Sequence, residues 1–307
     1  SGMDEKAASY RSAQPFPHIV LDDVLVPEAF DKAVGEFPGI KDEFWQGYLH
    51  VNETKYSNTQ PDTWGPTLHD VAEEFCGPRF VAFLEKLTGI EGLMSDWTMD
   101  GGGLHQTLRG GHLNIHADFT THHTHQNWAR RVNILLYLNE EWPEEWGGKL
   151  ELWDKDMTAC QGTVTPAGNR MLVFTTSFDS FHGHPDPLTC PETVARRSMA
   201  LYYFTEEEHA VRRSTNYQPR PDESVTRKAA IRADRTVVDI YDRVKRRLGI
   251  SDERIQAILA RVEREAPGQV IAVELERERG RWIYEIKLLG AGGSIVKLEI
   301  DARDGAV

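Results

Sequence analysis

The stretch RVNILLYLN, residues 131–139, is a strong candidate for a β-strand and belongs to the region that decides the fold. Because side chains alternate along a strand, Asn133, Leu135 and Tyr137 are expected on one face. From about residue 93 to residue 205, short β-type runs alternate with Gly, Pro, Asn and Asp, which commonly end strands. The expected strands cover 104–108, 112–118, 131–138, 149–153, 170–175 and 198–204. Short strands separated by irregular loops predict an all-β sandwich or jelly roll.

Helical patterns lie on both sides of this β region. After an apolar strand at 16–21, a helix is expected to begin at Pro27, and residues 66–88 predict two helical pieces. Residues 222–248 predict a charge-rich helix, and Ser251 is expected to cap a shorter one. Three strands of alternating hydrophobicity follow this last helix. The expected fold is therefore mainly β with supporting helices, plus a small C-terminal α+β unit.

The length of 307 residues is enough for one large domain or two unequal ones. We expect a first domain at 3–215, a helical extension or linker at 216–250 and a small α+β unit at 251–307. Ser1-Gly2 is read as an expression remnant and is left out of the first domain. The change from short strands to charge-rich helix sets the boundary after the first domain.

Composition argues against several classes of protein. The net charge of −13 disfavours a general nucleic-acid binder, because neutralising phosphates requires a basic face. No apolar run has the length of a membrane span, and no basic segment followed by an apolar run opens the chain, so no signal peptide is expected. The three cysteines, Cys76, Cys160 and Cys190, form no CxxC pair, which disfavours a disulfide framework and a thiolate zinc site. We expect a cytoplasmic protein that binds neither nucleic acid nor membranes.

The sequence His116-Ala117-Asp118 is a candidate for two ligands of a metal ion. On a strand, residues i and i+2 point to the same side, so His116 and Asp118 can reach one ion. Imidazole and carboxylate ligands suit ferrous iron, and two histidines with one carboxylate leave coordination positions open for substrates. The third ligand should come from a distant strand that crosses the same cavity.

Two histidines, His182 and His184, are candidates for the third ligand. His182 follows an apolar run and a short turn, whereas His184 precedes Pro185, which favours a loop conformation. We prefer His182 and keep His184 as the alternative.

An arginine pair opens the last strand of the β region and is a candidate anion site. Arg196 and Ser198 share a strand face, and Arg197 points the other way. An inward guanidinium beside a hydroxyl suits a carboxylate, because arginine binds carboxylates with two parallel hydrogen bonds. Arg196 is the preferred clamp and Arg197 the alternative. Tyr137 could donate to the same carboxylate, and Asn133 on its strand face completes the candidate cofactor-binding residues.

Five elements together resemble the prolyl 4-hydroxylase-like group of Fe(II)/2-oxoglutarate oxygenases. They are HxD at 116–118, Tyr-Leu-Asn at 137–139, Gly-Gly-x-Leu-x-Leu at 147–152, His182, and Arg196-x-Ser198 before an aromatic strand end. The opening Pro-Phe-Pro-His-Ile-Val-Leu-Asp-Asp also resembles the start of that family's domain, and the resemblance covers roughly residues 14–215. It implies a double-stranded β-helix, or jelly roll, with helices packed on one face.

The resemblance also implies an activity and its cofactors. It implies that His116, Asp118 and His182 bind Fe(II) and that Arg196 and Tyr137 hold the distal carboxylate of 2-oxoglutarate. The implied reaction uses dioxygen to hydroxylate an unactivated C–H bond and releases succinate and CO2, with ascorbate as a candidate reductant. Related halogenating enzymes need the carboxylate position vacant, so Asp118 favours hydroxylation. The substrate is left open among peptidyl proline, an amino acid, a glycan and another small molecule, and a homodimer is allowed.

Residues 251–307 resemble a PepSY module, including Asp301-x-x-x-Gly305 near the end. A packing appendage and a regulatory module are equally supported, because a fold analogy does not fix function. The alternative function for the whole chain is a non-catalytic peptide-binding protein that keeps the oxygenase fold and uses this unit for interaction. A nucleic-acid demethylase on the same scaffold is disfavoured by the acidic charge.

Overall fold

The computed structural model describes residues 2–42, 44–232, 269–278, 281–289 and 295–301. The chain divides into two units, Ser1–Arg235 and Thr236–Val307, and each is described by itself. A helix occupies 225–232, and the rest of the helix expected up to residue 248 lies outside the described residues, as does the helix expected after Ser251. The domain boundaries expected from the sequence stay a prediction.

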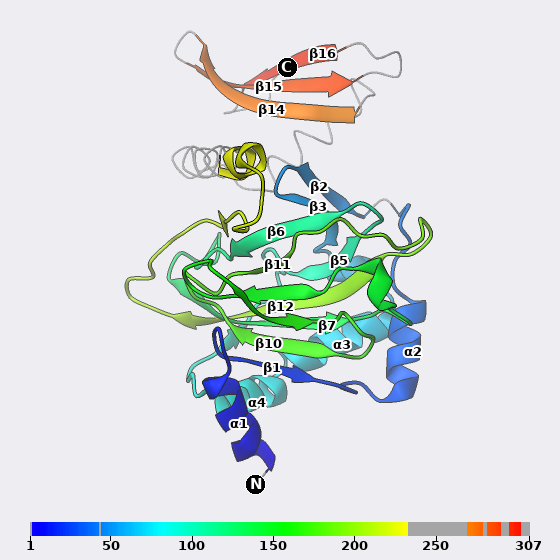
Figure 1. Ribbon diagram of the computed structural model, residues 1–307, viewed down its shortest axis with the longest axis vertical. Helices are drawn as coiled ribbons and strands as arrows, with labels where there is room; N and C mark the ends of the chain where they lie inside the picture. The colour runs from blue at the N-terminus through cyan, green and yellow to red at the C-terminus, as the bar shows by residue number, and fades with distance from the viewer. Residues whose placement is uncertain (1, 43, 233–268, 279–280, 290–294, 302–307) are drawn as a thin grey trace. The chain divides into compact units, whose positions relative to one another are not determined.

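The first unit is built on a thirteen-stranded sheet whose neighbouring strands run antiparallel (Figure 1). Its strands are β1 (His18–Leu21), β2 (Gln46–His50), β3 (Glu53–Asn58), β4 (Met94–Ser95), β5 (Gly103–Thr107), β6 (His112–Ala117), β7 (Trp128–Tyr137), β8 (Leu150–Trp153), β9 (Cys160–Val164), β10 (Met171–Thr175), β11 (His182–His184), β12 (Arg196–Glu206) and β13 (Asn216–Tyr217). The main path through the sheet is β1-β10-β7-β12-β5-β3-β6-β11-β8-β9.

This sheet folds back so that its two halves face each other. Arg196 of β12 donates a hydrogen bond to the carbonyl oxygen of Gly148, which lies just before β8. The ring of Phe174 on β10 lies 4.7 Å from the ring of His182 on β11. Neither pair of strands is adjacent in the sheet, so these contacts cross the interior between its halves. The prediction of a mainly β fold of the double-stranded β-helix type is confirmed for this unit.

Helices cover one outer face of the sheet, on the side of β1, β10 and β7 (Figure 1). They are α1 (Gly2–Ser12), α2 (Pro27–Gly35), α3 (Pro66–Cys76) and α4 (Pro78–Thr88), and short 3₁₀ turns occur at Pro61–Thr63 and Glu144–Trp146. Pro27, Pro66 and Pro78 each start a helix, where a missing N–H costs nothing. Apolar residues of α3 and α4 pack against the outward residues of β7, β10 and β12. This packing leaves the other face of these strands for the interior of the β-helix.

All six strands expected between residues 93 and 205 are present, as β5, β6, β7, β8, β10 and β12, and the strand expected at 16–21 is present as β1. The helix beginning at Pro27 and the two pieces within 66–88 are also confirmed. The sequence did not predict α1, whose buried side chains are only Ala7 and Tyr10, or the short strands β2, β3, β4, β9, β11 and β13. A helix with few apolar side chains and strands of this length leave little periodic hydrophobic signal.

The second unit contains a three-stranded antiparallel sheet in the order β14-β15-β16. Its strands are β14 (Gln269–Glu278), β15 (Arg281–Leu289) and β16 (Ile295–Asp301). The three strands expected after Ser251 are therefore confirmed. Among the residues that the structure describes in both units, none forms a helix with the length and apolar character needed to cross a membrane.

Candidate metal centre

The structure brings His116, Asp118 and His182 together in the interior of the β-helix. His116 lies on β6 and His182 opens β11, and the two residues are directly paired across these strands. Their ligand atoms and a carboxylate oxygen of Asp118 all lie within 4.8 Å of one another. Nε2 of His116 is 3.5 Å from Oδ1 of Asp118, and Nε2 of His182 is 3.6 Å from Oδ2. Three donors at such separations can share one metal ion.

Hydrogen bonds determine which ring nitrogen each histidine turns toward the position that a shared metal ion would occupy. Nδ1 of His116 lies 2.9 Å from the carbonyl oxygen of Asn114, and Nδ1 of His182 lies 2.9 Å from that of Ser180. A nitrogen beside a carbonyl must carry the proton, so Nε2 of each ring keeps its lone pair. These backbone contacts orient both imidazoles as metal ligands require.

Electrostatics favours the protonation states that bind a metal. Burial lowers the pKa of His182 to about 4, so its imidazole is neutral at pH 7. Burial alone would raise the pKa of Asp118, but Arg130 and the two histidines hold it well below its ordinary value. Two imidazoles and one carboxylate form the donor set expected for Fe(II) with open coordination positions. The donor set therefore fits the metal.

His184 does not join this group, although it lies two residues after His182. It pairs with Leu113 on β6, and its register to β6 shifts relative to that of His182. The side chain is buried, and burial followed by the charge of Arg196 pushes its pKa well below the ordinary value. The structure thus places His182, and not His184, beside His116 and Asp118.

Arg196 is a buried cation deeper in the same interior. The side chain is 6% exposed, and Nε donates to the carbonyl oxygen of Gly148 at 2.9 Å. A terminal nitrogen donates to the hydroxyl of Tyr137 at 3.4 Å. Among the residues that the structure describes, no carboxylate forms an ion pair with Arg196. Since a buried charge without a counter-charge is costly, this site is suited to an anionic ligand.

The other candidate cofactor-binding residues separate into two places. Ser198 is buried and lies directly opposite Tyr137 in the ladder between β12 and β7, close to Arg196. Asn133 instead donates from Nδ2 to Oδ2 of Asp118 at 2.7 Å, at the metal end of the interior. The sequence put Asn133 and Tyr137 on one strand face, and the hydrogen bonds show that they serve opposite ends of it.

Arg197 points to the other side of β12. Its guanidinium lies 5.1 Å from the ring centre of Phe37, a residue of the helix-covered core. The backbone N–H of Arg197 donates to Oδ1 of Asn139 at 2.8 Å. The doubled arginine therefore presents one guanidinium to the interior and one to the helical layer.

Several charged and polar side chains near the centre were missed from the sequence. Glu53 on β3 accepts a hydrogen bond from the hydroxyl of Tyr217 at 3.1 Å and forms an ion pair with Lys55 at 3.0 Å. The ring of Tyr217 lies 5.5 Å from that of His116. His105, opposite Ser198 on β5, is partly buried, and burial lowers its pKa to about 3. Only the strand register, which the sequence does not give, brings these residues to the site.

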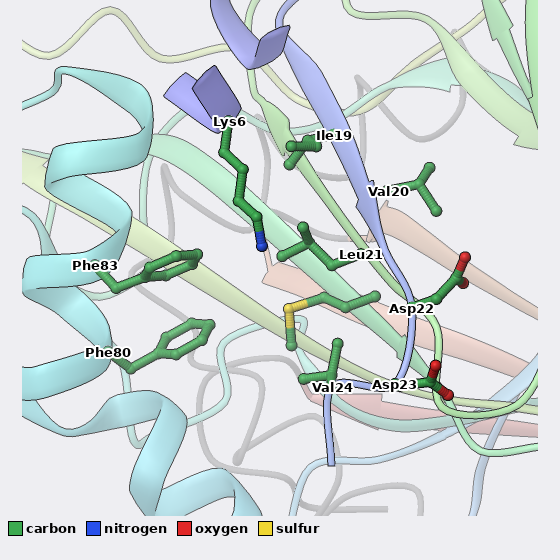
Figure 2. A pocket seen from close by; sticks show the side chains of 10 residues that line it. Lys6, Ile19, Val20, Leu21, Asp22, Asp23, Val24, Phe80 and Phe83 are labelled. Carbon is green, nitrogen blue, oxygen red and sulfur yellow. The ribbon is translucent and has the colours of Figure 1, made fainter. Parts of the chain in front are cut away.

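A pocket of about 530 Å³ lies elsewhere, between β1 and α4. Figure 2 shows Lys6 extending toward the space between Phe83 and Leu21. The pocket is lined by Lys6, Ile19, Val20, Leu21, Asp22, Asp23, Val24, Phe80, Phe83 and Met171. None of the candidate metal ligands lines it, so we treat it as separate from the metal centre.

Comparison with protein families gives two matches. Residues 102–220 match the 2OG-Fe(II) oxygenase superfamily, and residues 251–307 match the family described as peptidase propeptide and YPEB domain, or PepSY. The first match contains all candidate iron and 2-oxoglutarate residues. No curated protein matches the chain.

Solved structures similar to this chain include two prolyl hydroxylases and the protein HygX. A prolyl-4-hydroxylase from Pseudomonas putida is 15% identical, with coverage of 66% of this chain and 100% of that chain and a TM-score of 0.46. A prolyl hydroxylase from Trichoplax adhaerens, in complex with a hypoxia inducible factor peptide, is 14% identical, with coverage of 66% and 88% and a TM-score of 0.48. HygX from Streptomyces hygroscopicus, with nickel, 2-oxoglutarate and hygromycin B bound, is 13% identical, with coverage of 66% and 86% and a TM-score of 0.42. Residues 102–220 are thus similar to the 2OG-Fe(II) oxygenase superfamily and residues 251–307 to PepSY, and the resemblance stated from the sequence is confirmed at this level.

Proposed function

We propose that this chain is an Fe(II)- and 2-oxoglutarate-dependent dioxygenase that hydroxylates an unactivated C–H bond of a small-molecule or peptidyl substrate. One observation carries the proposal. The His116–Asp118–His182 group and the buried Arg196, which has no carboxylate partner within the described part of the chain, occur in the same β-helix interior. A two-histidine, one-carboxylate group alone suits several metals, and a buried arginine alone suits many anions. Together they supply a metal site for one end of the cosubstrate and an anion site for its other end.

The three metal ligands are held before any metal arrives. His116 and His182 would bind Fe(II) through Nε2, because Nδ1 of each ring is engaged with a backbone carbonyl. Asp118 would supply one carboxylate oxygen. When bound, the iron supplies the oxidative chemistry, in which one atom of dioxygen enters the C–H bond and the other enters succinate as CO2 leaves 2-oxoglutarate. Coordination by three protein ligands leaves positions for 2-oxoglutarate and dioxygen.

Arg196, Tyr137 and Ser198 would hold the distal carboxylate of 2-oxoglutarate. The guanidinium already has Nε bound to Gly148, and this hydrogen bond fixes its plane. A carboxylate that accepts from the remaining N–H groups would pair the buried charge and orient the oxo-acid end toward the histidines. Apolar side chains of the interior, including Leu152 of β8, exclude water around the bound diacid.

Charge supports the same assignment. The distal carboxylate of the 2-oxoglutarate dianion would pair the buried charge of Arg196, and Asp118 with the other carboxylate of the dianion would face the positive charge of Fe(II). A buried site gains most when its charges are fully paired. Without the metal and the cosubstrate, Arg196 has no carboxylate partner among the described residues.

The proposal is tested by succinate release from protein loaded with iron under anaerobic conditions and then exposed to dioxygen. We expect slow succinate formation that requires both iron and 2-oxoglutarate and rises when a true substrate is added from panels of prolyl peptides, amino acids and glycans. His116→Ala should abolish it, whereas His18→Ala, a histidine of β1, should not. Failure of the wild-type protein to bind 2-oxoglutarate in calorimetry with metal present would favour the non-catalytic peptide-binding alternative.

The same proposal includes features that stand on the sequence. We propose ascorbate as a reductant that keeps the iron ferrous, a cytoplasmic location, and no binding to nucleic acid or membranes. The PepSY region is proposed as an interaction module, and a homodimer is allowed. Each is open to direct measurement, for example by sedimentation for the oligomeric state.

A further inference from the structure

The two carboxylate oxygens of Asp118 have different surroundings. Oδ2 accepts a hydrogen bond from Nδ2 of Asn133 at 2.7 Å and lies 3.2 Å from a terminal nitrogen of Arg130. Oδ1 lies 3.5 Å from Nε2 of His116. Oδ2 is also 3.6 Å from Nε2 of His182, but the hydrogen bond from Asn133 and the ion pair with Arg130 already occupy its side of the carboxylate. Oδ1 is therefore the oxygen that remains available to a metal.

The orientation of the Asn133 amide is determined by its other partners. Its Oδ1 accepts from Nε of Arg130 at 2.8 Å and from Oγ1 of Thr176 at 3.0 Å. Arg130 decides the orientation, since an arginine N–H can donate but cannot accept a hydrogen bond, and the Thr176 hydroxyl then donates to the same oxygen. The amide oxygen must therefore face Arg130, and the amide nitrogen must face Asp118. At 1% exposure, Asn133 has no water-facing alternative.

Arg130 is itself immobilised. The side chain is 3% exposed, and its guanidinium carbon lies 3.3 Å from the ring centre of Tyr202 and 4.4 Å from that of Phe119. Stacking on aromatic faces fixes the plane of a guanidinium and adds cation–π attraction. Arg130 can thus serve as a rigid support for Asn133 as well as a counter-charge for Asp118.

A β-bulge explains why Arg130 reaches the interior. Phe204 of β12 pairs with Arg130 of β7, but the preceding Tyr203 pairs with Val132, so Arg131 is an extra residue. Simple alternation from Asn133 would turn Arg131 inward. The bulge reverses this and sends Arg131 to Thr205, to which its Nε donates at 2.8 Å. Bulges that re-aim a side chain are common beside active sites.

We propose that Asn133 is a positioning residue that, with Arg130 and Thr176, holds Oδ2 of Asp118 away from the metal and makes the carboxylate a one-oxygen ligand. This inference rests on the proposed function, since it requires a metal at the site. A carboxylate that bound through both oxygens would take a coordination position needed by 2-oxoglutarate or dioxygen. Asn133 then acts through Asp118 and not through the cosubstrate, a role that the sequence did not suggest.

The test compares metal-free protein variants in their binding of Mn²⁺, followed by electron paramagnetic resonance. Asn133→Asp has the same size but replaces the donor with a charge that repels Asp118, and Arg130→Met removes the support. We expect 10- to 100-fold weaker Mn²⁺ binding for each, the usual effect of losing a hydrogen-bond partner of a metal ligand. Thr176→Val should show a smaller loss that Thr176→Ser restores. Arg131→Met, the neighbouring arginine outside the interior, should bind as the wild type does.

A second readout separates positioning from general destabilisation. The absorption spectrum of bound Co²⁺ reports the number and arrangement of ligands, and it should change in Asn133→Asp and Thr176→Val but not in Arg131→Met. If Asn133→Asp fails to fold, the pair Thr176→Val and Thr176→Ser decides. Variants with wild-type Mn²⁺ affinity and an unchanged Co²⁺ spectrum would overturn this inference alone. A wild-type protein that binds neither metal would overturn the proposed function as well.

Discussion

The replacement of Arg196 by methionine separates ligand binding from stability, because the affinity for 2-oxoglutarate should fall while the stability of the ligand-free protein should not. Arg196 is 6% exposed and uses Nε on Gly148 and one terminal nitrogen on the Tyr137 hydroxyl, which leaves other N–H groups for a ligand. Removing one partner of a buried ion pair costs about 3–5 kcal/mol. Since about 1.4 kcal/mol is tenfold, the affinity for 2-oxoglutarate should fall by roughly two to three and a half orders of magnitude.

Stability of the ligand-free protein should not fall in the same variant. Without ligand, Arg196 is a buried cation that has no carboxylate partner among the described residues, and burial already lowers its pKa. Methionine has a similar length and no charge to desolvate, so the unfolding midpoint should stay the same or rise. A general packing defect would instead lower the midpoint and the affinity together.

Calorimetry of 2-oxoglutarate binding to Mn²⁺-loaded protein, with thermal unfolding of the metal-free protein, measures both effects. Arg197→Met is the matched control, because its guanidinium lies over Phe37 on the helix-covered side of β12. It should leave 2-oxoglutarate affinity near the wild-type value. Wild-type affinity in Arg196→Met, or a loss seen only in Arg197→Met, would refute the assignment of the clamp.

Three further predictions follow from individual side chains. His182→Ala should weaken Mn²⁺ binding at least 100-fold, whereas His184→Ala should change it only a few-fold; similar losses in both would contradict the assignment of the third ligand. His105 has a pKa of about 3 in the folded protein, below its ordinary 6.5, so the unfolded chain takes up the proton first and stability falls as the pH drops from 6.5 toward 3. Denaturant unfolding at several pH values should show a shallower fall for His105→Gln, by up to about 1.4 kcal/mol per pH unit, and parallel curves would disprove the buried-neutral state. Leu104→Ala, at 0% exposure in the helix-covered core, should cost about 2–5 kcal/mol in the same assay, and a cost below 1 kcal/mol would mean that the site collapses around the cavity.

The sequence predicted correctly the elements in which hydrophobic residues recur with a strong period. Along β7, the helix-facing residues Val132, Ile134 and Leu136 are fully buried in the main core, and their alternation with Asn133 and Tyr137 is visible in the sequence. The pair His116 and Asp118 also follows from a period of two. A local pattern was sufficient in these cases because the spacing of residues along a strand determines the face to which each side chain points.

What the sequence left open depends on contacts between distant strands. The choice between His182 and His184 follows from the pairing of His182 with His116, which no local pattern contains. The inward position of Arg130 follows from the bulge in β7 opposite β12. Strict alternation of side chains along β7 would have placed Arg131 in the interior instead. Hydrogen-bond partners of buried polar groups are set by tertiary approach, so residue type and spacing cannot assign them.

One strand thus fixes the distance between the two ends of the proposed site. Asn133 supports the metal end and Tyr137 the anion end, four residues apart on β7, which is about 13 Å at the rise of a strand. A slip of β7 by one residue would turn both side chains into the helical layer and bring Ile134 and Leu136 inward. Burial of those apolar residues under α3 and α4 prevents the slip. The helical layer, which lies outside the β-helix, therefore fixes the face of β7 that carries Asn133 and Tyr137 into the interior.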